Sequence, residues 1–134
     1  ITPILGVAAR RAVLKACGVA ADIKWPNDLY FGGKKFCGIL AESQTLNVTI
    51  NIAVGIGVNI NTDMGLLPEE VRGIATSLKE ITGKETDWDE FLKILTAELD
   101  EVQRSFPECR EEYLDEFRKY CFNLENNQIV RIDI

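Results

Sequence analysis

Residues 48–61 read VTINIAVGIGVNIN, and this stretch decides the fold of the chain. Apolar side chains occupy every second position, which is the period of a β-strand with one buried face. That predicted core face consists of Val48, Ile50, Ile52, Val54, Ile56, Val58 and Ile60. The opposite face consists of Thr49, Asn51, Ala53, Gly55, Gly57, Asn59 and Asn61. Its middle carries two glycines and its end two amides, so we expect a surface bare enough to receive a flat ligand.

A lysine and a proline mark the end of an earlier strand, in the sequence Lys24-Trp25-Pro26-Asn27-Asp28. Proline has no N–H to donate, so the strand over about residues 21–25 ends there and leaves Lys24 at its terminus. In the functional interpretation, the Lys24 ammonium lies near a carboxylate or phosphate. There it would offset the negative charge that builds up when two anions are brought together. A solvated strand-end lysine is the common alternative. Asp28 either caps its own turn or helps to hold a metal ion.

The segments around these two strands predict an antiparallel meander with helices. Gly32-Gly33 between two apolar runs is typical of a tight hairpin, which gives three or four antiparallel strands. A helix is expected over residues 3–17, with Thr2 as its cap and Gly18 as its end. Further helices are expected from Pro68, over residues 75–81, from Thr86 or Asp87 to Phe106, and near residues 113–121. We therefore expect an α+β fold, a mixed and largely antiparallel sheet with helices packed on one face.

Composition excludes several kinds of chemistry. The 134 residues suit about one domain, and no apolar run approaches the roughly 18 residues of a membrane helix. Six basic and three acidic residues give +3 over residues 1–60, whereas nine basic and eighteen acidic residues give −9 over the rest. The first half therefore suits an anionic ligand. No histidine is present, so an imidazole base or metal ligand is excluded within the chain. The four cysteines lack CxxC spacing, which favours a reduced, cytoplasmic protein over a zinc site.

Two glycine motifs fail as nucleotide-binding fingerprints. The GIG at residues 55–57 lacks the third glycine of a dinucleotide fingerprint, whose place Ile60 takes, and no helix follows at once. The GGKK at residues 32–35 lacks the upstream glycine and the Ser/Thr of a phosphate-binding loop. Gly55 and Gly57 are equally compatible with a bulge or with close packing of another backbone. Asn59 on the same face favours a ligand, because an amide at the strand's end can bind a polar group.

Three blocks taken together resemble the biotin–protein ligase family: KWPNDL at residues 24–29, KFCGILAE at 35–42 and GIGVNIN at 55–61. The resemblance implies an enzyme that condenses biotin with ATP to biotinyl-5′-AMP and pyrophosphate, with Mg²⁺ for ATP use. It also implies transfer of biotin to a lysine of the biotin-acceptor domain of a carboxylase. A lipoate-type ligase, which shares the architecture, is the alternative enzyme. A non-catalytic module that binds a small acid or a partner protein is the alternative of another class.

The resemblance also implies which residues form the site. It implies that Lys24 contacts the biotin carboxylate and the α-phosphate, and that Asn59 engages the adenylate. The family's positions around the flat bicyclic ring of biotin correspond to four residues of this chain: Gly38, Ile39, Gly55 and Gly57. The helical second half is expected to hold no catalytic residue.

The family's Gly/Arg-rich loop and its ureido-binding residues have no match in this chain. We therefore expect a fragment that is incomplete at both ends and turns over poorly by itself. Residues 1–125 would form the C-terminal part of the ligase catalytic domain, and residues 126–134 the first strand of a truncated C-terminal β-barrel-like domain. The sheet edges would support a homodimer. No membrane partner is expected, and nucleic acid would be a partner only through a separate DNA-binding domain.

Overall fold

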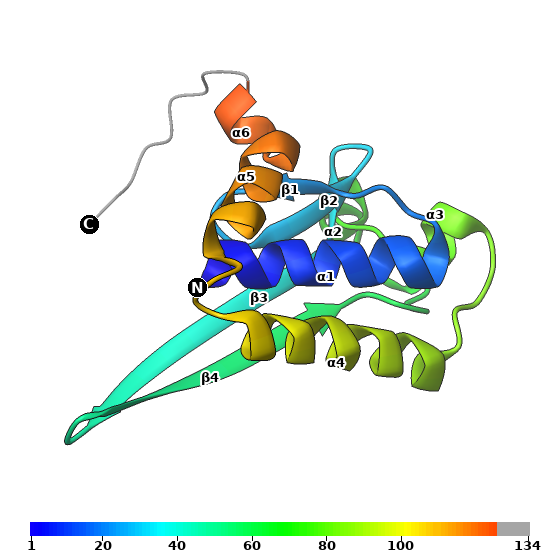
Figure 1. Cartoon of the computed structure of the whole chain (residues 1–134). Helices are drawn as coiled ribbons and strands as arrows, with labels where there is room; N and C mark the ends of the chain where they lie inside the picture. The colour runs from blue at the N-terminus through cyan, green and yellow to red at the C-terminus, as the bar shows by residue number, and fades with distance from the viewer. Residues whose placement is uncertain (126–134) are drawn as a thin grey trace.

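The computed structural model describes residues 1–125, which form one sheet and a layer of helices (Figure 1). The strand predicted within residues 126–134 lies outside the described residues. The strands are β1 (Asp22–Lys24), β2 (Asp28–Phe31), β3 (Lys34–Leu46) and β4 (Thr49–Val58). The helices are α1 (Thr2–Cys17), α2 (Glu69–Ile74), α3 (Leu78–Thr82), α4 (Trp88–Ser105), α5 (Arg110–Tyr120) and α6 (Phe122–Glu125), with a 3-10 turn, η1, at Met64–Leu66.

Neighbouring strands pair antiparallel in the order β1-β2-β3-β4, so the predicted meander is confirmed. Gly32 and Gly33 join β2 to β3 with φ of +57° and +78°, a conformation that a two-residue hairpin turn requires and that glycine adopts without strain. Helices α1, α4 and α5 lie on one face of this sheet, and the α+β fold expected from the sequence is confirmed.

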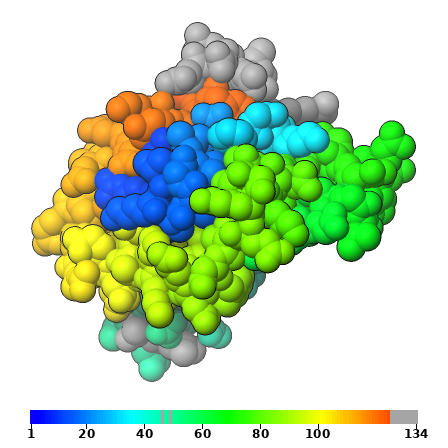
Figure 2. Space-filling view, turned by 90° about the vertical axis from the view of Figure 1, so that its right-hand side faces the viewer, coloured from blue at the N-terminus to red at the C-terminus, as the bar shows by residue number. Residues whose placement is uncertain are grey.

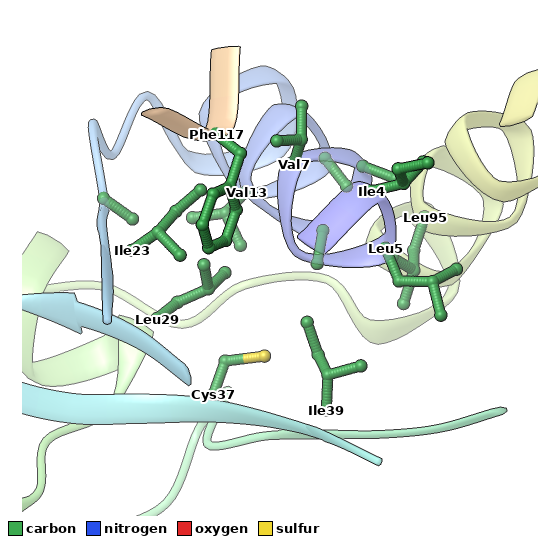
Figure 3. Close-up of a cluster of buried hydrophobic side chains, with 14 of the residues drawn as sticks. Ile4, Leu5, Val7, Val13, Ile23, Leu29, Cys37, Ile39, Leu95 and Phe117 are labelled. Atoms are coloured by element: carbon green, nitrogen blue, oxygen red, sulfur yellow. The ribbon is translucent and has the colours of Figure 1, made fainter. Parts of the chain in front are cut away.

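The hydrophobic core lies between the sheet and α1. Leu29, Cys37 and Ile39 point from the sheet toward α1, and they are buried together with Val7 and Val13 of that helix (Figure 3). Helices α4 and α5 flank α1 and close the core from its two sides. Seen from the end of α1, the segments of α1, α3, α4 and α5 meet without a gap (Figure 2). Because the first strands bury one face against α1, their opposite face points away from that helix.

Helix boundaries follow most of the sequence signals. Gly18 ends α1, and Asp87 caps α4 by accepting a hydrogen bond from the Glu90 N–H, as expected. The prediction that Thr2 caps α1 is wrong, because Thr2 is already helical and Ile1 precedes it without a side-chain cap. The helix predicted over residues 75–81 begins only at Leu78, because the backbone before it pairs with β3 instead, where the Thr76 N–H donates to the Lys35 carbonyl.

The predicted core face of β4 is buried along only part of its length. Ile60, just beyond β4, is buried and Ile56 packs against the core, but Val54 is 42 % exposed and Ile50 66 % exposed. The β3–β4 ribbon is longer than the helices that cover it and projects beyond them (Figure 1). The expectation of a continuous core face is therefore wrong for the half of β4 nearest the turn.

Candidate functional site

Four sequence-predicted positions form one row across the sheet. In the strand register Lys24 faces Asp28, Asp28 faces Gly38, and Gly38 faces Gly57. Facing residues of paired strands project from the same side of a sheet. The row therefore lies on the side opposite the helices, since Leu29 and Cys37, the neighbours of this row, point into the core.

Two hollows open along this row, and they share Lys35, Gly38 and Gly57. The first has a volume of about 480 Å³. Its lining is Asn27, Asp28, Lys35, Gly38, Ile39, Leu40, Gly55, Ile56 and Gly57. The second has a volume of about 470 Å³. Its lining is Lys35, Phe36, Cys37, Gly38, Gly57, Val58, Asn59 and Ala75. We call them the glycine hollow and the Asn59 hollow.

The glycines leave space that nothing in the described chain fills. A Cβ added at Gly55 would come no closer than 4.0 Å to another residue's atoms beyond its chain neighbours, and one at Gly57 no closer than 3.9 Å, which are ordinary contact distances. The β3–β4 register is also unbroken at both positions. Neither a bulge nor a closely packed backbone therefore explains these glycines, and the bareness of the surface is available to a ligand.

A bulge brings Lys35 to this surface. Leu29 pairs with Cys37 but Tyr30 pairs with Lys35, so Phe36 is left without an opposite residue. Strict alternation would place Lys35 on the core side with Cys37; instead Phe36 and Cys37 are both buried and Lys35 projects from the other face. Sequence reasoning missed Lys35 for this reason. The signal available was the second of two adjacent lysines beside a hairpin turn.

Lys35 and Asp28 form an ion pair across the glycine hollow. The Lys35 Nζ lies 2.7 Å from the Asp28 Oδ1, and the Asp28 side chain is only 18 % exposed. A Cβ added at Gly38 would stand 3.1 Å from the Lys35 Nζ, so the ammonium also lies beside Gly38. Because the lysine stem is flexible and its head is half in water, this ammonium can turn toward an incoming anion. Doing so takes the ion-pair partner from the buried Asp28 Oδ1.

The other predicted site residues, Lys24, Asn59 and Ile39, differ in their position relative to the two hollows. The Lys24 Nζ lies 3.4 Å from the Tyr30 hydroxyl and 5.1 Å from the centre of the Tyr30 ring, at the end of the row and outside the lining of both hollows. Asn59 lines its hollow while its Nδ2 donates to the Thr76 carbonyl. Ile39 has a buried side chain, so it contributes backbone to the glycine hollow.

Two further residues near the site, Asn61 and Cys37, are structural or chemically inert. Asn61 exchanges two hydrogen bonds with the Thr86 backbone, so its amide holds two loops together. Burial, with a smaller contribution from Asp28, raises the pKa of the Cys37 thiol to about 12. Cys37 is therefore a neutral thiol in the core and no nucleophile.

The metal-binding capacity of the described residues is small. Within residues 1–125 no three Cys, Asp or Glu side chains gather in a way that would hold an ion. Asp28 is the carboxylate at the glycine hollow, and Lys35 already pairs with it. This donor set fits a Mg²⁺ ion that arrives on nucleotide phosphates, because Mg²⁺ typically keeps waters and takes one or two protein carboxylates.

Comparisons with known proteins found similarity to one group of ligases. Residues 4–59 match the model of the biotin/lipoate A/B protein ligase family. The bifunctional ligase/repressor BirA of Bacillus subtilis is 39 % identical over 88 residues, which are 65 % of this chain and 27 % of that protein. The chain thus spans about a quarter of the curated relatives it matches.

Solved structures give the same result. Biotin protein ligase from Aquifex aeolicus in complex with biotin and ATP has 34 % sequence identity and a TM-score of 0.77, over 90 % of this chain and 50 % of that one. The ligase from Leishmania major in complex with biotinyl-5-AMP has a TM-score of 0.74 at 24 % identity, over 57 % of its length, and supports the fold alone.

The fold and the matched segment resemble those of the biotin/lipoate ligase class. Within that class, the relatives and solved structures named above are biotin protein ligases or a ligase/repressor, which agrees with the resemblance of the three sequence blocks. No helix within residues 1–125 combines the length and the apolar character that crossing a bilayer takes.

Proposed function

We propose that this chain supplies the carboxylate- and nucleotide-binding surface of an ATP-dependent biotin protein ligase. The observation that carries the proposal is the pair of hollows that meet at Lys35, Gly38 and Gly57. The flat ring system of biotin would lie over the glycines, and the adenylate would extend into the Asn59 hollow. The two substrates would then meet beside the lysine.

In the first step a biotin carboxylate oxygen attacks the α-phosphorus of ATP and pyrophosphate leaves. Both partners are anions, so a cation at the junction reduces their repulsion and stabilises the charge of the transition state. We propose that Lys35 supplies this cation by turning from Asp28 to the reacting oxygens. Lys24 stays a predicted contact of the carboxylate and α-phosphate, acting from the end of the row. Mg²⁺ bound to the phosphates would neutralise further charge.

In the second step the ε-amine of a lysine attacks the acyl carbon of biotinyl-5′-AMP, AMP leaves and an amide forms. We propose that this lysine belongs to the biotin-acceptor domain of a carboxylase. The half-exposed Lys35 and the open glycine row leave a face on which such a domain can approach.

The domain assignment and the surroundings belong to the same proposal. Residues 1–125 would be the C-terminal part of the catalytic domain and residues 126–134 the start of the next domain. The four cysteines are free, which agrees with a cytoplasmic location. A homodimer through the sheet edges and DNA binding by a separate domain stay predictions.

The test is biotin-dependent pyrophosphate exchange by the full-length gene product and its lysine variants. Lys35→Ala should lower the exchange rate by about 10²- to 10³-fold, the usual cost of one transition-state donor. Lys34→Ala is the matched control: its Nζ donates to the Arg72 carbonyl, away from both hollows, and exchange should be unchanged. Lys24→Ala tests the contact predicted from the sequence, and a rate equal to that of the control removes Lys24 from the mechanism.

A second measurement separates the alternatives. The 134-residue chain, labelled with ¹⁵N, is titrated with biotin, lipoate and ATP in turn. Shifts of the Gly38, Gly55 and Gly57 amides with biotin support the proposal, and the same shifts with lipoate alone indicate a lipoate-type ligase. A full-length protein that binds biotin and catalyses no exchange is a binding module, and the proposed activity is then wrong.

A further inference from the structure

The end of the described chain contacts the strand that carries Lys24. Cys121 forms a parallel bridge with Ile23, and the Trp25 N–H donates a hydrogen bond of 3.1 Å to the Asn123 Oδ1. Asn123 is 9 % exposed, so its amide is committed to the interior. These residues belong to the helical half of the chain, and Figure 1 shows α6 beside β1.

The same contact supports one end of the turn between β1 and β2. At the other end of that turn, Asn27 and Ile39 exchange two hydrogen bonds of 2.8 Å each: the Asn27 Nδ2 donates to the Ile39 carbonyl, and the Ile39 N–H donates to the Asn27 carbonyl. The turn is thus held at its exit by β3 and at its entry by Asn123. Asp28 follows directly and faces Lys35 in the glycine hollow.

A second contact runs parallel to the first. The Phe122 ring packs edge-on against Tyr30, with ring centres 5.9 Å apart, and the Tyr30 hydroxyl lies 3.4 Å from the Lys24 Nζ. The short segment Cys121–Asn123 therefore touches the strand, the turn and the tyrosine that surround Lys24.

We propose that Asn123 is a positioning residue for the ligand site. Its side-chain oxygen holds the Trp25 N–H and so fixes the entry of the turn that delivers Asn27 and Asp28 to the glycine hollow. No residue near Trp25 in sequence takes this part in the described structure, so the partner comes from 98 positions along the chain. The proposal rests on the function proposed above for the identity of the ligand, and on the contacts alone for the positioning.

Two substitutions and one control test the positioning on the full 134-residue chain. Asn123→Ala removes the acceptor oxygen, whereas Asn123→Asp keeps an oxygen at the same place. The control is Val102→Ala, which disturbs the buried face of α4, on the side of α1 away from β1 and the turn (Figure 1). Hydrogen exchange of the Trp25 amide is followed by NMR, relative to amides of α1.

Loss of one hydrogen bond should speed Trp25 exchange about fivefold to tenfold in Asn123→Ala, with the α1 amides changed less. Asn123→Asp should restore most of the protection, and Val102→Ala should affect α1 and Trp25 together. The Asp28 carboxyl resonance should move in Asn123→Ala and return in Asn123→Asp. Unchanged Trp25 exchange in Asn123→Ala, or the same selective loss in Val102→Ala, overturns the proposal.

The catalytic consequence is measured separately in the full-length gene product. Asn123→Ala should raise the KM for biotin about tenfold and change kcat less, because the turn is displaced and the reacting groups are retained. If the unsubstituted protein catalyses no exchange, the proposed function fails, whereas the exchange data on Trp25 still decide the positioning. If the protein is active and the Asn123→Ala variant keeps its KM for biotin, positioning by Asn123 is wrong.

Discussion

Gly55 and Gly57 are the residues whose type says most about a ligand. Glycine in a strand interior lowers stability, because it loses more backbone entropy on folding and packs no side chain. The described chain gives no packing reason for that cost, since alanine would fit at both positions. The remaining physical reason for glycine at these positions is the open space above them, on the face of the sheet that carries Lys35.

Gly57→Ala should separate stability from binding. The free energy of unfolding should stay the same or rise by about 0.4–1 kcal/mol, because alanine restricts the unfolded chain. Ligand affinity should fall by about 1–3 kcal/mol, the cost of an added methyl in a filled site. Urea denaturation measures the first and titration with biotin and ATP the second.

Gly6→Ala is the matched control for this prediction. Gly6 lies in α1, on the opposite side of the sheet, and its added Cβ would stand 4.0 Å from the Ile39 Cδ1. This variant should also be stabilised, by up to about 1 kcal/mol from helix propensity, with unchanged ligand affinity. An equal loss of affinity in both variants would show that the effect is not local to the glycine hollow.

At the scale of elements, the β3–β4 ribbon differs in burial along its length. Its first part, near Ile39 and Ile56, is packed under α1 and holds the glycine row in place. Its second part is exposed on the helix-facing side as well, where Ile50 and Ile52 are 66 % and 48 % exposed. Exposed apolar residues in a long ribbon are unusual and stabilise little in the described chain.

The same substitution should therefore have unequal costs along β3 and β4. Ile39→Thr, at a buried position, should lower the free energy of unfolding by about 2 kcal/mol or more, through lost burial and an added hydroxyl. Ile50→Thr should change it by less than about 0.5 kcal/mol, since threonine keeps the β propensity and the site is open. Urea unfolding of both variants checks this, and equal costs would mean that the ribbon is buried along its whole length.

At the scale of the molecule, one buried arginine joins the helical layer to the sheet. The Arg10 Nε donates to the Ala21 carbonyl at 2.8 Å, its guanidinium lies 3.4 Å above the Tyr120 ring, and it pairs with Glu116 at 3.6 Å. These contacts tie α1, the loop that precedes β1, and α5. The position of β1, and with it Lys24, thus depends on a residue remote in sequence.

Removing this link should be costly. Arg10→Ala should lower the free energy of unfolding by about 2–4 kcal/mol, because the Ala21 carbonyl loses its partner and the space above Tyr120 is left empty. Arg118→Ala, which breaks an exposed pair with Asp115 on α5, should cost less than about 0.5 kcal/mol. Thermal and urea denaturation followed by circular dichroism compare them, and a cost for Arg10→Ala as small as that for Arg118→Ala would contradict the prediction.

Much of the fold was readable because its signals are local. Gly18, the Gly32-Gly33 turn and the Asp87 cap each act within a few residues, and all three lie where the sequence placed them. The three motif blocks likewise predicted the resemblance to biotin protein ligases, whereas the row of Asp28, Gly38 and Gly57 follows from the strand register. The extent of burial was not readable, since it depends on where α1 and α4 end above the sheet.

By itself the sequence determined the period of the strands, the points where elements stop, and the bare glycine face, because each follows from bond geometry and side-chain size at neighbouring positions. Only the tertiary structure decided which lysine lines the two hollows. The pairing of β2 with β3 forces Phe36 into the core and turns Lys35 outward, and that pairing couples residues that local alternation treats as independent. It also decided that Asn123, 98 positions from Trp25, holds the turn beside the site, because such a contact exists only once the helical layer is packed against the sheet.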